Sequence, residues 1–156
     1  MLARDYDLDC SVARSLELIG ERWSLLVIRD VFLGHRRFDE IQSSLGIARN
    51  VLASRLGRLM DEGILDKRPY QERPTRYEYF LTEKGLDLWP VLVALMAYGD
   101  KYGLPEGAEP PTRIVHKECG GTVNDRRICE RCGAELDVRD AYAIRSGSAG
   151  RAAVAA

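Results

Sequence analysis

Apolar side chains recur at three- and four-residue spacing through the first 60 residues, which is the pattern of helices with one buried face. Four helices are predicted, at about residues 11–19, 22–33, 38–45 and 49–60. Ser11 is expected to cap the first helix, and Gly20, Gly34 and Gly46 are expected to end the first three. The third and fourth helices are joined by a turn that contains Gly46, so this pair has the spacing of a helix-turn-helix.

The pattern becomes extended after Gly63. Two strands are predicted, at residues 64–70 and 76–81, with the polar, proline-containing segment 71–75 as the turn between them. Helices, a helix-turn-helix and then a basic hairpin follow one another in the order of a winged helix. In that fold the recognition helix enters the major groove, and the hairpin reaches phosphates or the minor groove beside it.

The next predicted helix, residues 82–103, is apolar on nearly every face in its middle. Pro90 is expected to kink or restart it, because proline removes a backbone donor. A helix of this kind must be buried on more than one side, and a small domain offers only one. A second copy of the chain is therefore expected to cover the other side, although a central core helix in a monomer is the alternative. The candidate dimer-interface residues are Trp89, Leu92, Leu95 and Met96.

A short module with cysteine and histidine follows a linker. The predicted organisation is a DNA-binding and dimerisation domain at residues 1–103, a linker at 104–112, a Cys/His module at 113–140 and a flexible tail at 141–156. His116, Cys119, Cys129 and Cys132 form the pattern H-x2-C-x9-C-x2-C, and glycine follows Cys119 and Cys132. Tetrahedral zinc takes such ligands at such spacings, and a module this short has too little core to fold alone. A structural zinc site is expected; a metal-free hairpin and a redox Cys129/Cys132 pair are the alternatives.

Charge is distributed unevenly along a chain whose net charge is only -1. Residues 49–76 hold seven basic side chains and four acidic ones, so the predicted recognition helix and hairpin form a locally basic surface. Arginine side chains recognise guanine, asparagine side chains recognise adenine, and both also bind phosphate. For Arg36 and Arg37, phosphate binding and an ordinary surface role are equally good interpretations. The candidate DNA-binding residues are Arg49, Asn50, Ser54, Arg55, Arg58, Arg73, Arg76, Arg36 and Arg37, with Lys67 and Arg68 behind the hairpin tip.

Several classes of protein are disfavoured. The first ten residues contain no apolar signal region, and the sequence has no run of 18 apolar residues, so we expect a cytoplasmic protein that does not enter a membrane. With two histidines, no phosphate-binding glycine loop and no catalytic triad pattern, an enzyme is not expected. Two alternatives to a DNA-binding protein are a thiol-disulfide redox protein that uses Cys129 and Cys132, and a winged-helix adaptor that binds other proteins.

The segment from Cys10 to Tyr102 resembles the HxlR-type transcriptional regulators, which are related to the MarR group. The resemblance is carried, in order, by CSVARSLELIGERWSLLVIRDVFLGHRRFDEI, NVLASRLGRLMDEGIL and RPYQERPTRYEYFLTEKG. It implies a mainly α winged helix-turn-helix fold with a small β-hairpin wing. It also implies a homodimeric regulator of transcription, here expected to be a repressor that binds a roughly palindromic operator in double-stranded DNA. In several members a cysteine near the first helix senses an oxidant or a small electrophile, and Cys10 stands at that position. The C-terminal zinc-ribbon-like module is found in only some relatives.

Overall fold

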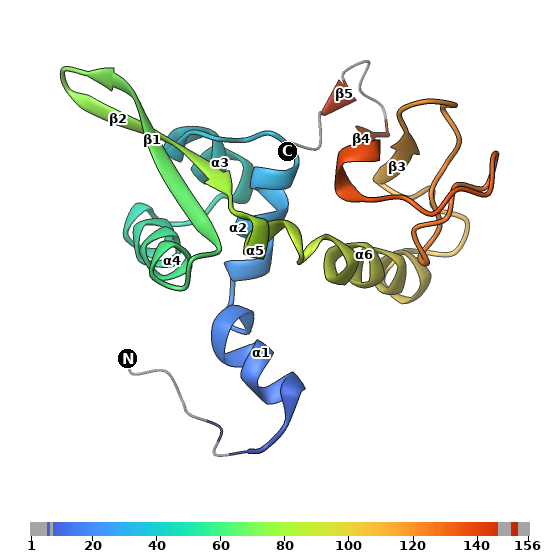
Figure 1. Ribbon diagram of the computed structural model, residues 1–156, viewed down its shortest axis with the longest axis horizontal. Coiled ribbons are helices and arrows are strands. Elements are labelled where there is room, and N and C mark those ends of the chain that lie inside the picture. Colours follow the sequence, from blue (N-terminus) through green and yellow to red (C-terminus); the bar gives the residue numbers. More distant parts are fainter. Residues whose placement is uncertain (1–5, 7, 147–150, 153–156) are drawn as a thin grey trace. The chain divides into compact units, whose positions relative to one another are not determined.

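The computed structural model describes residue 6, residues 8–146 and residues 151–152 (Figure 1). The described chain divides into two compact units. The N-terminal unit contains the residues up to Val31 and His35–Gly85, and the C-terminal unit contains Phe32–Gly34 and the residues from Leu86 onward.

The four helices predicted for the first 61 residues are present. They are α1 (Ser11–Ile19), α2 (Ser24–Phe32), α3 (Phe38–Leu45) and α4 (Arg49–Asp61). Two details of the prediction are wrong. Cys10, not Ser11, occupies the N-cap position of α1. The second helix begins at Ser24 instead of Arg22, because Trp23 has a φ of 82°, in the left-handed region that a right-handed helix cannot include.

The core of the N-terminal unit is built from the apolar stripe of each helix. Leu52 and Leu59 of α4 are 0% exposed, as are Ile41 of α3 and Ile28 of α2. The turn between α3 and α4 depends on Gly46, which has a φ of 64° and whose N–H donates to the Gln42 carbonyl. Helix α4 therefore leaves the turn with its stripe directed into the core.

The wing is an antiparallel hairpin of β1 (Leu65–Glu72) and β2 (Thr75–Leu81). The strands are longer than predicted and leave only Arg73 and Pro74 between them. The other edge of β2 contacts the segment before α3: the N–H of Tyr79 donates to the Arg36 carbonyl at 2.7 Å, and Arg37 forms a bridge with Glu78. Backbone pairing thus fixes the hairpin to the start of α3, and Figure 1 shows it projecting past that helix.

The predicted restart at Pro90 is confirmed. The helical segment is broken into α5 (Glu83–Leu86) and α6 (Trp89–Gly103), with proline in the first turn of α6. Trp89 and Val93 are 5% and 2% exposed, so one face of α6 belongs to the core of the C-terminal unit.

The Cys/His module contains β3 (Thr112–His116), the 3-10 turn η1 (Val138–Asp140), β4 (Ala141–Arg145) and the short β5 (Arg151–Ala152). Strand β4 pairs antiparallel with both β3 and β5. Residues 141–145 were expected in a flexible tail, and that expectation is wrong because Ala141 and Ala143 are 0% and 3% exposed and form one buried face of the strand. Residues 147–150 and 153–156 of the expected tail lie outside the described residues.

Helix α6 and the module belong to the same compact unit. Val93 and Met96 of α6 line one cleft together with Val123 and Asn124 of the module. The division between units therefore falls near residue 86, and the segment expected as an interdomain linker, 104–112, connects α6 to β3 within the C-terminal unit.

Within the described part of the chain, the structure contains no helix whose length and apolar character would let it cross a bilayer.

Replacing a core residue of α4 should destabilise the N-terminal unit. Leu56 is 1% exposed, so Leu56→Ala should lower the free energy of unfolding by about 2–5 kcal/mol through lost apolar burial and a cavity. Urea unfolding followed by circular dichroism measures the change. The matched control is Ser54→Ala, two residues away on the exposed face of the same helix, for which a change within about 0.5 kcal/mol is expected. Equal destabilisation by the two substitutions would contradict this packing.

Candidate nucleic-acid interface and Cys/His cluster

The outward face of α4 carries part of the predicted recognition set. Arg49, Asn50 and Ser54 are exposed, as is Ala53 between them. They lie opposite the buried stripe at helical spacing, so the same packing that buries the leucines directs these side chains outward.

Arg55 and Arg58 lie on a different face and have partners inside the unit. Arg55 forms an ion pair with Glu21 at 3.0 Å, and its side chain is only 20% exposed. Arg58 donates to the backbone carbonyl of Glu17 at 3.2 Å and pairs with Glu62 at 3.3 Å. These two guanidinium groups connect α4 to the end of α1. The sequence did not indicate this role, because the partners are more than 30 residues away along the chain.

Arg49 keeps most of its surface in solvent. Its side chain is 72% exposed, pairs with Asp39 at 3.5 Å and lies 4.6 Å above the Phe38 ring. An exposed ion pair of this length contributes little free energy, so an external anion can replace it.

The wing tip presents two further arginines. Arg73 and Arg76 are exposed, and no hydrogen bond or ion pair of either side chain is found among the described residues. Behind the tip, cationic side chains stack on aromatic rings of the hairpin. Arg68 lies 4.5 Å from the centre of the Phe80 ring, and Lys67 lies 4.5 Å from that of Tyr77. The stacking holds positive charge along the wing.

Arg36 and Arg37 are held at the base of the wing. The Glu40 carboxylate accepts both of their backbone N–H groups at 3.0 Å. Desolvation raises the pKa of Glu40, but these two hydrogen bonds and the positive charge of Arg37 outweigh it, so that the pKa is lowered. The Arg37 side chain donates to Glu78 at 3.1 Å, which raises the pKa of that guanidinium, and the Arg36 side chain lies 4.3 Å from the centre of the Phe80 ring.

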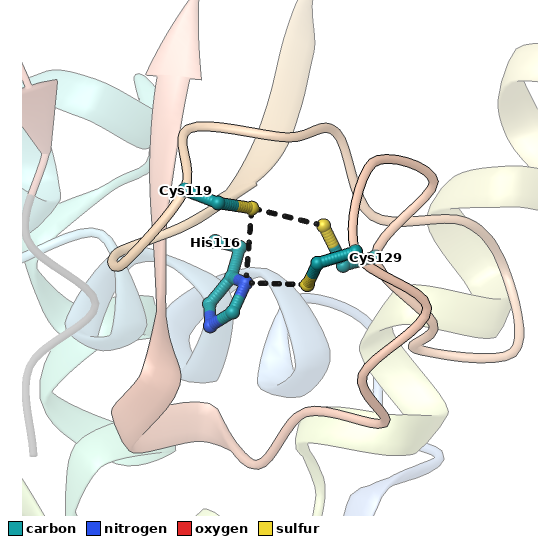
Figure 2. Close-up of side chains that lie close together, drawn as sticks. His116, Cys119 and Cys129 are labelled. Atoms are coloured by element: carbon teal, nitrogen blue, oxygen red, sulfur yellow. Dashed lines mark hydrogen bonds between the residues drawn. The ribbon is translucent and has the colours of Figure 1, made fainter.

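The four predicted metal ligands lie close together in the Cys/His module (Figure 2). Their ligand atoms all lie within 4.8 Å of one another. The Cys119 sulfur is 3.3 Å from His116 Nδ1 and 3.4 Å from the Cys129 sulfur, and the Cys132 sulfur is 3.4 Å from the same Nδ1. These sulfurs are too far apart for a disulfide, which needs about 2.05 Å.

The donor set suits tetrahedral zinc. With Zn–S bonds of about 2.3 Å and Zn–N bonds of about 2.1 Å, neighbouring ligand atoms would be about 3.5–3.8 Å apart. The three short separations, 3.3–3.4 Å, are slightly below those edges, and all four ligand atoms lie within 4.8 Å of one another. Three sulfurs and one imidazole leave no coordination position open, so such a site has a structural role.

Two equivalent turns bring the ligands together. After His116 the N–H of Gly120 donates back to the His116 carbonyl at 2.9 Å, and after Cys129 the N–H of Gly133 donates back to the Cys129 carbonyl at 2.8 Å. Both glycines have a positive φ, 71° and 75°, which favours glycine at each position. The Cys129 and Cys132 pair therefore lies in a turn and not at the start of a helix.

Backbone amides point at the sulfurs. The N–H of Cys132 and that of Arg131 lower the pKa of Cys129 to about 6, because they stabilise its thiolate. The N–H of Gly121 acts in the same direction on Cys119, but desolvation and the thiols of Cys129 and Cys132 outweigh it, so the pKa of Cys119 is raised.

Gly121 is required by close approach. A Cβ atom at this position would lie 2.6 Å from the Cys129 sulfur and 2.5 Å from the Arg131 Cβ. Only a residue without a side chain allows the first turn to approach the second this closely.

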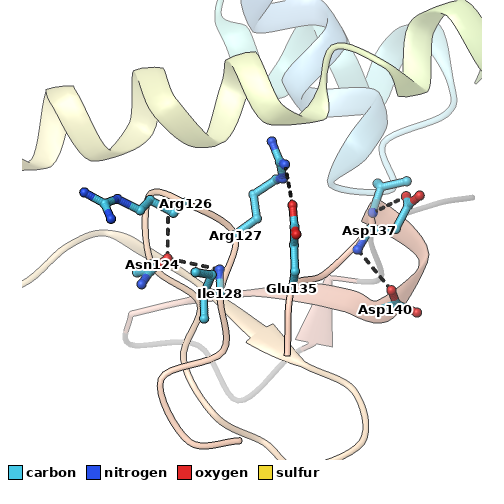
Figure 3. A network of polar contacts seen from close by, with 8 residues as sticks. Asn124, Arg126, Arg127, Ile128, Glu135, Asp137 and Asp140 are labelled. Atoms are coloured by element: carbon cyan, nitrogen blue, oxygen red, sulfur yellow. Dashed lines mark hydrogen bonds and ion pairs between the residues drawn. The ribbon is translucent and has the colours of Figure 1, made fainter. Parts of the chain in front are cut away.

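The segment between Cys119 and Cys129 folds back as a hairpin. Val123 forms a bridge with Cys129. At the tip of the hairpin the Asn124 side-chain oxygen accepts the N–H groups of Arg126 and Ile128, each at 3.0 Å (Figure 3). Arg127 pairs with Glu135 at 3.1 Å and is directed toward α6 in the same view.

A stripe of apolar residues on α6 is exposed. Val91, Leu95, Tyr98 and Tyr102 are 41%, 47%, 67% and 65% exposed, and their spacing of four, three and four residues places them on one face. Trp89 was expected at a dimer interface but is buried in the C-terminal unit. Leu92 and Met96, from the same predicted set, are half-buried.

Helix α1 also exposes apolar side chains, among them Val12 and Leu16, at 66% and 43%. Cys10 is exposed at the N-cap of this helix.

Comparison with known proteins places the winged-helix region in one family. A family model described as HxlR-like helix-turn-helix matches residues 18–106, more than half of the chain. An uncharacterized HTH-type transcriptional regulator of Mycobacterium tuberculosis is 47% identical over 130 residues, which cover 83% of this chain and 82% of the relative.

Two solved structures are similar. The crystal structure of PA1607, assigned as a transcription factor, is 38% identical with a TM-score of 0.69, over 86% of this chain and 93% of that one. The oxidized form of the redox regulator HypR is 28% identical with a TM-score of 0.52, over 59% of this chain and 96% of that one.

Proposed function

Because the chain belongs to the HxlR-like helix-turn-helix family of transcriptional regulators, we propose that it binds a roughly palindromic operator as a homodimer and represses transcription. The family match confirms the resemblance seen in the sequence and the winged helix-turn-helix fold. The observation that carries the proposal is the outward face of α4, with the exposed arginines of the wing tip in the same compact unit.

The proposed contacts divide by geometry. Arg49, Asn50 and Ser54 lie in the first half of α4, the part of a recognition helix that reaches base edges. Arg73 and Arg76 at the wing tip are placed for phosphate or minor-groove contacts, and Arg36 and Arg37 for phosphate. Arg55 and Arg58 support the helix from inside, so we propose that they position the interface without contacting bases.

Dimerisation is supported by the two apolar faces of α6. Val93 and Met96 face the module, whereas Leu95 and Tyr98 lie on the opposite, exposed face. An exposed apolar stripe of this length favours burial against a second chain, because water is then released from both copies. The apolar side chains of α1 are proposed to contribute to the same association. A dimer occupying both half-sites of an operator would exclude polymerase from an overlapping promoter.

Sensing through Cys10 is proposed from its place at the start of α1. Cys10 is exposed at the N-cap of α1, so a reagent in solution can reach its sulfur. A structural neighbour is a redox regulator in its oxidized form. An oxidant or a small electrophile that modifies Cys10 would add a group beside the proposed dimer contacts of α1.

Zinc is proposed as the structural ion of the Cys/His cluster, bound by His116 Nδ1 and the sulfurs of Cys119, Cys129 and Cys132. The four ligand atoms lie within 4.8 Å of one another, close enough to surround one ion after small side-chain adjustments, and the backbone amides favour the thiolate of Cys129. The buried apolar side chains of this module form a small core, so the binding free energy of the metal would add to its folding free energy; they are Ile114, Val115, Leu136, Val138, Ala141 and Ala143.

DNA binding should weaken steeply with salt, with a log–log slope of about -0.9 for each phosphate contact. Asn50→Ala should relax base preference at one operator position, at a cost of about 1–3 kcal/mol there. Arg73→Ala should weaken binding to all sequences similarly and reduce the salt slope by about one contact. Titrations of duplex DNA at several salt concentrations measure all three. Arg126→Ala, an exposed arginine of the other unit, is the control and should leave affinity unchanged. Salt-independent binding by the wild type would reject the interface.

The wild type should be a stable dimer whose recognition helices are about 34–36 Å apart, one turn of DNA. Leu95→Glu should shift it toward monomer, because a charge in an apolar contact is desolvated without a partner. Sedimentation at micromolar concentration measures the mass. Ser43→Glu adds the same charge at an exposed site of α3 and should leave the dimer intact. A monomeric wild type would contradict the proposal.

Protein purified without chelator should contain about one zinc ion per chain by elemental analysis. Gly121→Ala should lower that content, because the new methyl group would overlap the Cys129 sulfur, whereas Gly99→Ala, which meets no atom within 4 Å, should not. Chelation should expose the module to protease while largely sparing operator binding. A protease-resistant module without metal would disprove the zinc site.

Mild oxidant should change the operator affinity of the wild type and leave that of Cys10→Ser unchanged, because only the former can be modified at the start of α1. Both proteins are treated in parallel and titrated with operator DNA. An identical response of the two would show that Cys10 has no part in sensing.

A further inference from the structure

The four residues of the Cys/His cluster differ in their exposure to solvent. Cys129 and His116 are 1% and 4% exposed, and Cys119 is half-buried. Cys132 is exposed, and so are its neighbours Arg131 and Gly133. Cys132 is therefore the cysteine residue of the cluster that a solvent-borne reagent reaches most readily.

We propose that Cys132 is a redox modification site: in the zinc-bound cluster it is the sulfur that hydroperoxides attack first, and its oxidation releases the metal. The inference rests on the zinc site proposed above. A metal ion holds its sulfur ligands as thiolates, and susceptibility to oxidation follows thiolate character combined with exposure. Cys132 is the sulfur that combines both.

The chemistry is a two-step oxidation. The thiolate of Cys132 attacks one oxygen of the hydroperoxide, the O–O bond breaks, hydroxide or alkoxide leaves, and the sulfur becomes a sulfenic acid. The thiolate of Cys119 or Cys129 then attacks that sulfur, an S–S bond forms and hydroxide leaves. Two electrons pass from the two sulfurs to the peroxide. The partner is already in place, since all the ligand atoms lie within 4.8 Å of one another.

Loss of two ligands leaves the zinc ion with one sulfur and one imidazole, too few to hold it. The module would then lose the interaction that supports its fold. Val123 of the module lines a cleft with Val93 and Met96 of α6, so unfolding of the module would expose that face of the helix. Oxidation at Cys132 would in this way act on α6, independently of Cys10 in the other unit.

The test uses the full-length Cys10→Ser protein, in which the three remaining cysteines all belong to the cluster. Its zinc content is measured first, and hydrogen peroxide is then added in the presence of a chromogenic zinc chelator. The expected result is release of the bound zinc with loss of two thiols per ion, and mass spectrometry should find an intramolecular disulfide that includes Cys132. Trapping with dimedone at substoichiometric peroxide should label Cys132 before the other two sulfurs.

The matched variant is Cys132→His in the same background, because histidine keeps a zinc ligand at that position and forms no sulfenic acid. Its peroxide-dependent zinc release should be lost. If this variant binds no zinc, the disulfide identified by mass spectrometry in the Cys10→Ser protein is the deciding result.

Three results would overturn the inference: full zinc retention under peroxide, a disulfide between Cys119 and Cys129, or equally fast release from Cys132→His. Absence of zinc before peroxide is added would instead overturn the metal site, and this inference with it.

Discussion

Burial of the apolar stripe of α4 is the interaction on which the proposed DNA interface depends. Leu52, Leu56 and Leu59 are almost completely removed from solvent. Each such side chain contributes about 1.5–3 kcal/mol relative to an exposed position, so a rotated helix would lose several times that amount. The rotation of α4 is therefore fixed, and Arg49, Asn50 and Ser54 have no other direction than outward. The turn at Gly46 sets the angle at which that face is presented.

The arginines of α4 illustrate how one residue type takes two roles. Arg55 and Arg58 reach carboxylates and a carbonyl of the same unit, which anchors the helix to the end of α1. Arg49 is only loosely paired with an exposed carboxylate and stays free to meet an external anion. The contacts of Arg55 and Arg58 hold α4 in place, and the same helix presents Arg49 to solvent. The same division recurs at the wing, where stacked cations lie behind exposed ones at the tip.

The C-terminal unit follows a different physical logic. Its module is small. Its regular structure comes from two glycine-closed turns, a hairpin and a three-stranded sheet, and it has a cluster of sulfur and nitrogen ligands where a larger domain would have more apolar side chains. Helix α6 joins this module to the rest of the unit by one face and exposes a stripe on the other. The module with its proposed metal site lies against one face of α6, and the proposed dimer contact lies on the opposite face.

Local pattern alone determined the four helices, the hairpin, the restart at Pro90 and the identity of the four clustered ligands, because periodicity, glycine and proline positions and ligand spacing are properties of neighbouring residues. Only the tertiary structure decided what depends on partners distant in the chain. It assigned Arg55 to Glu21, buried Trp89, and turned residues expected in a flexible tail into β4, since Ala141 and Ala143 pack only once β3 lies beside them. It also showed which cysteine of the cluster faces solvent. Exposure depends on how separate turns come together, and no short segment of sequence encodes that.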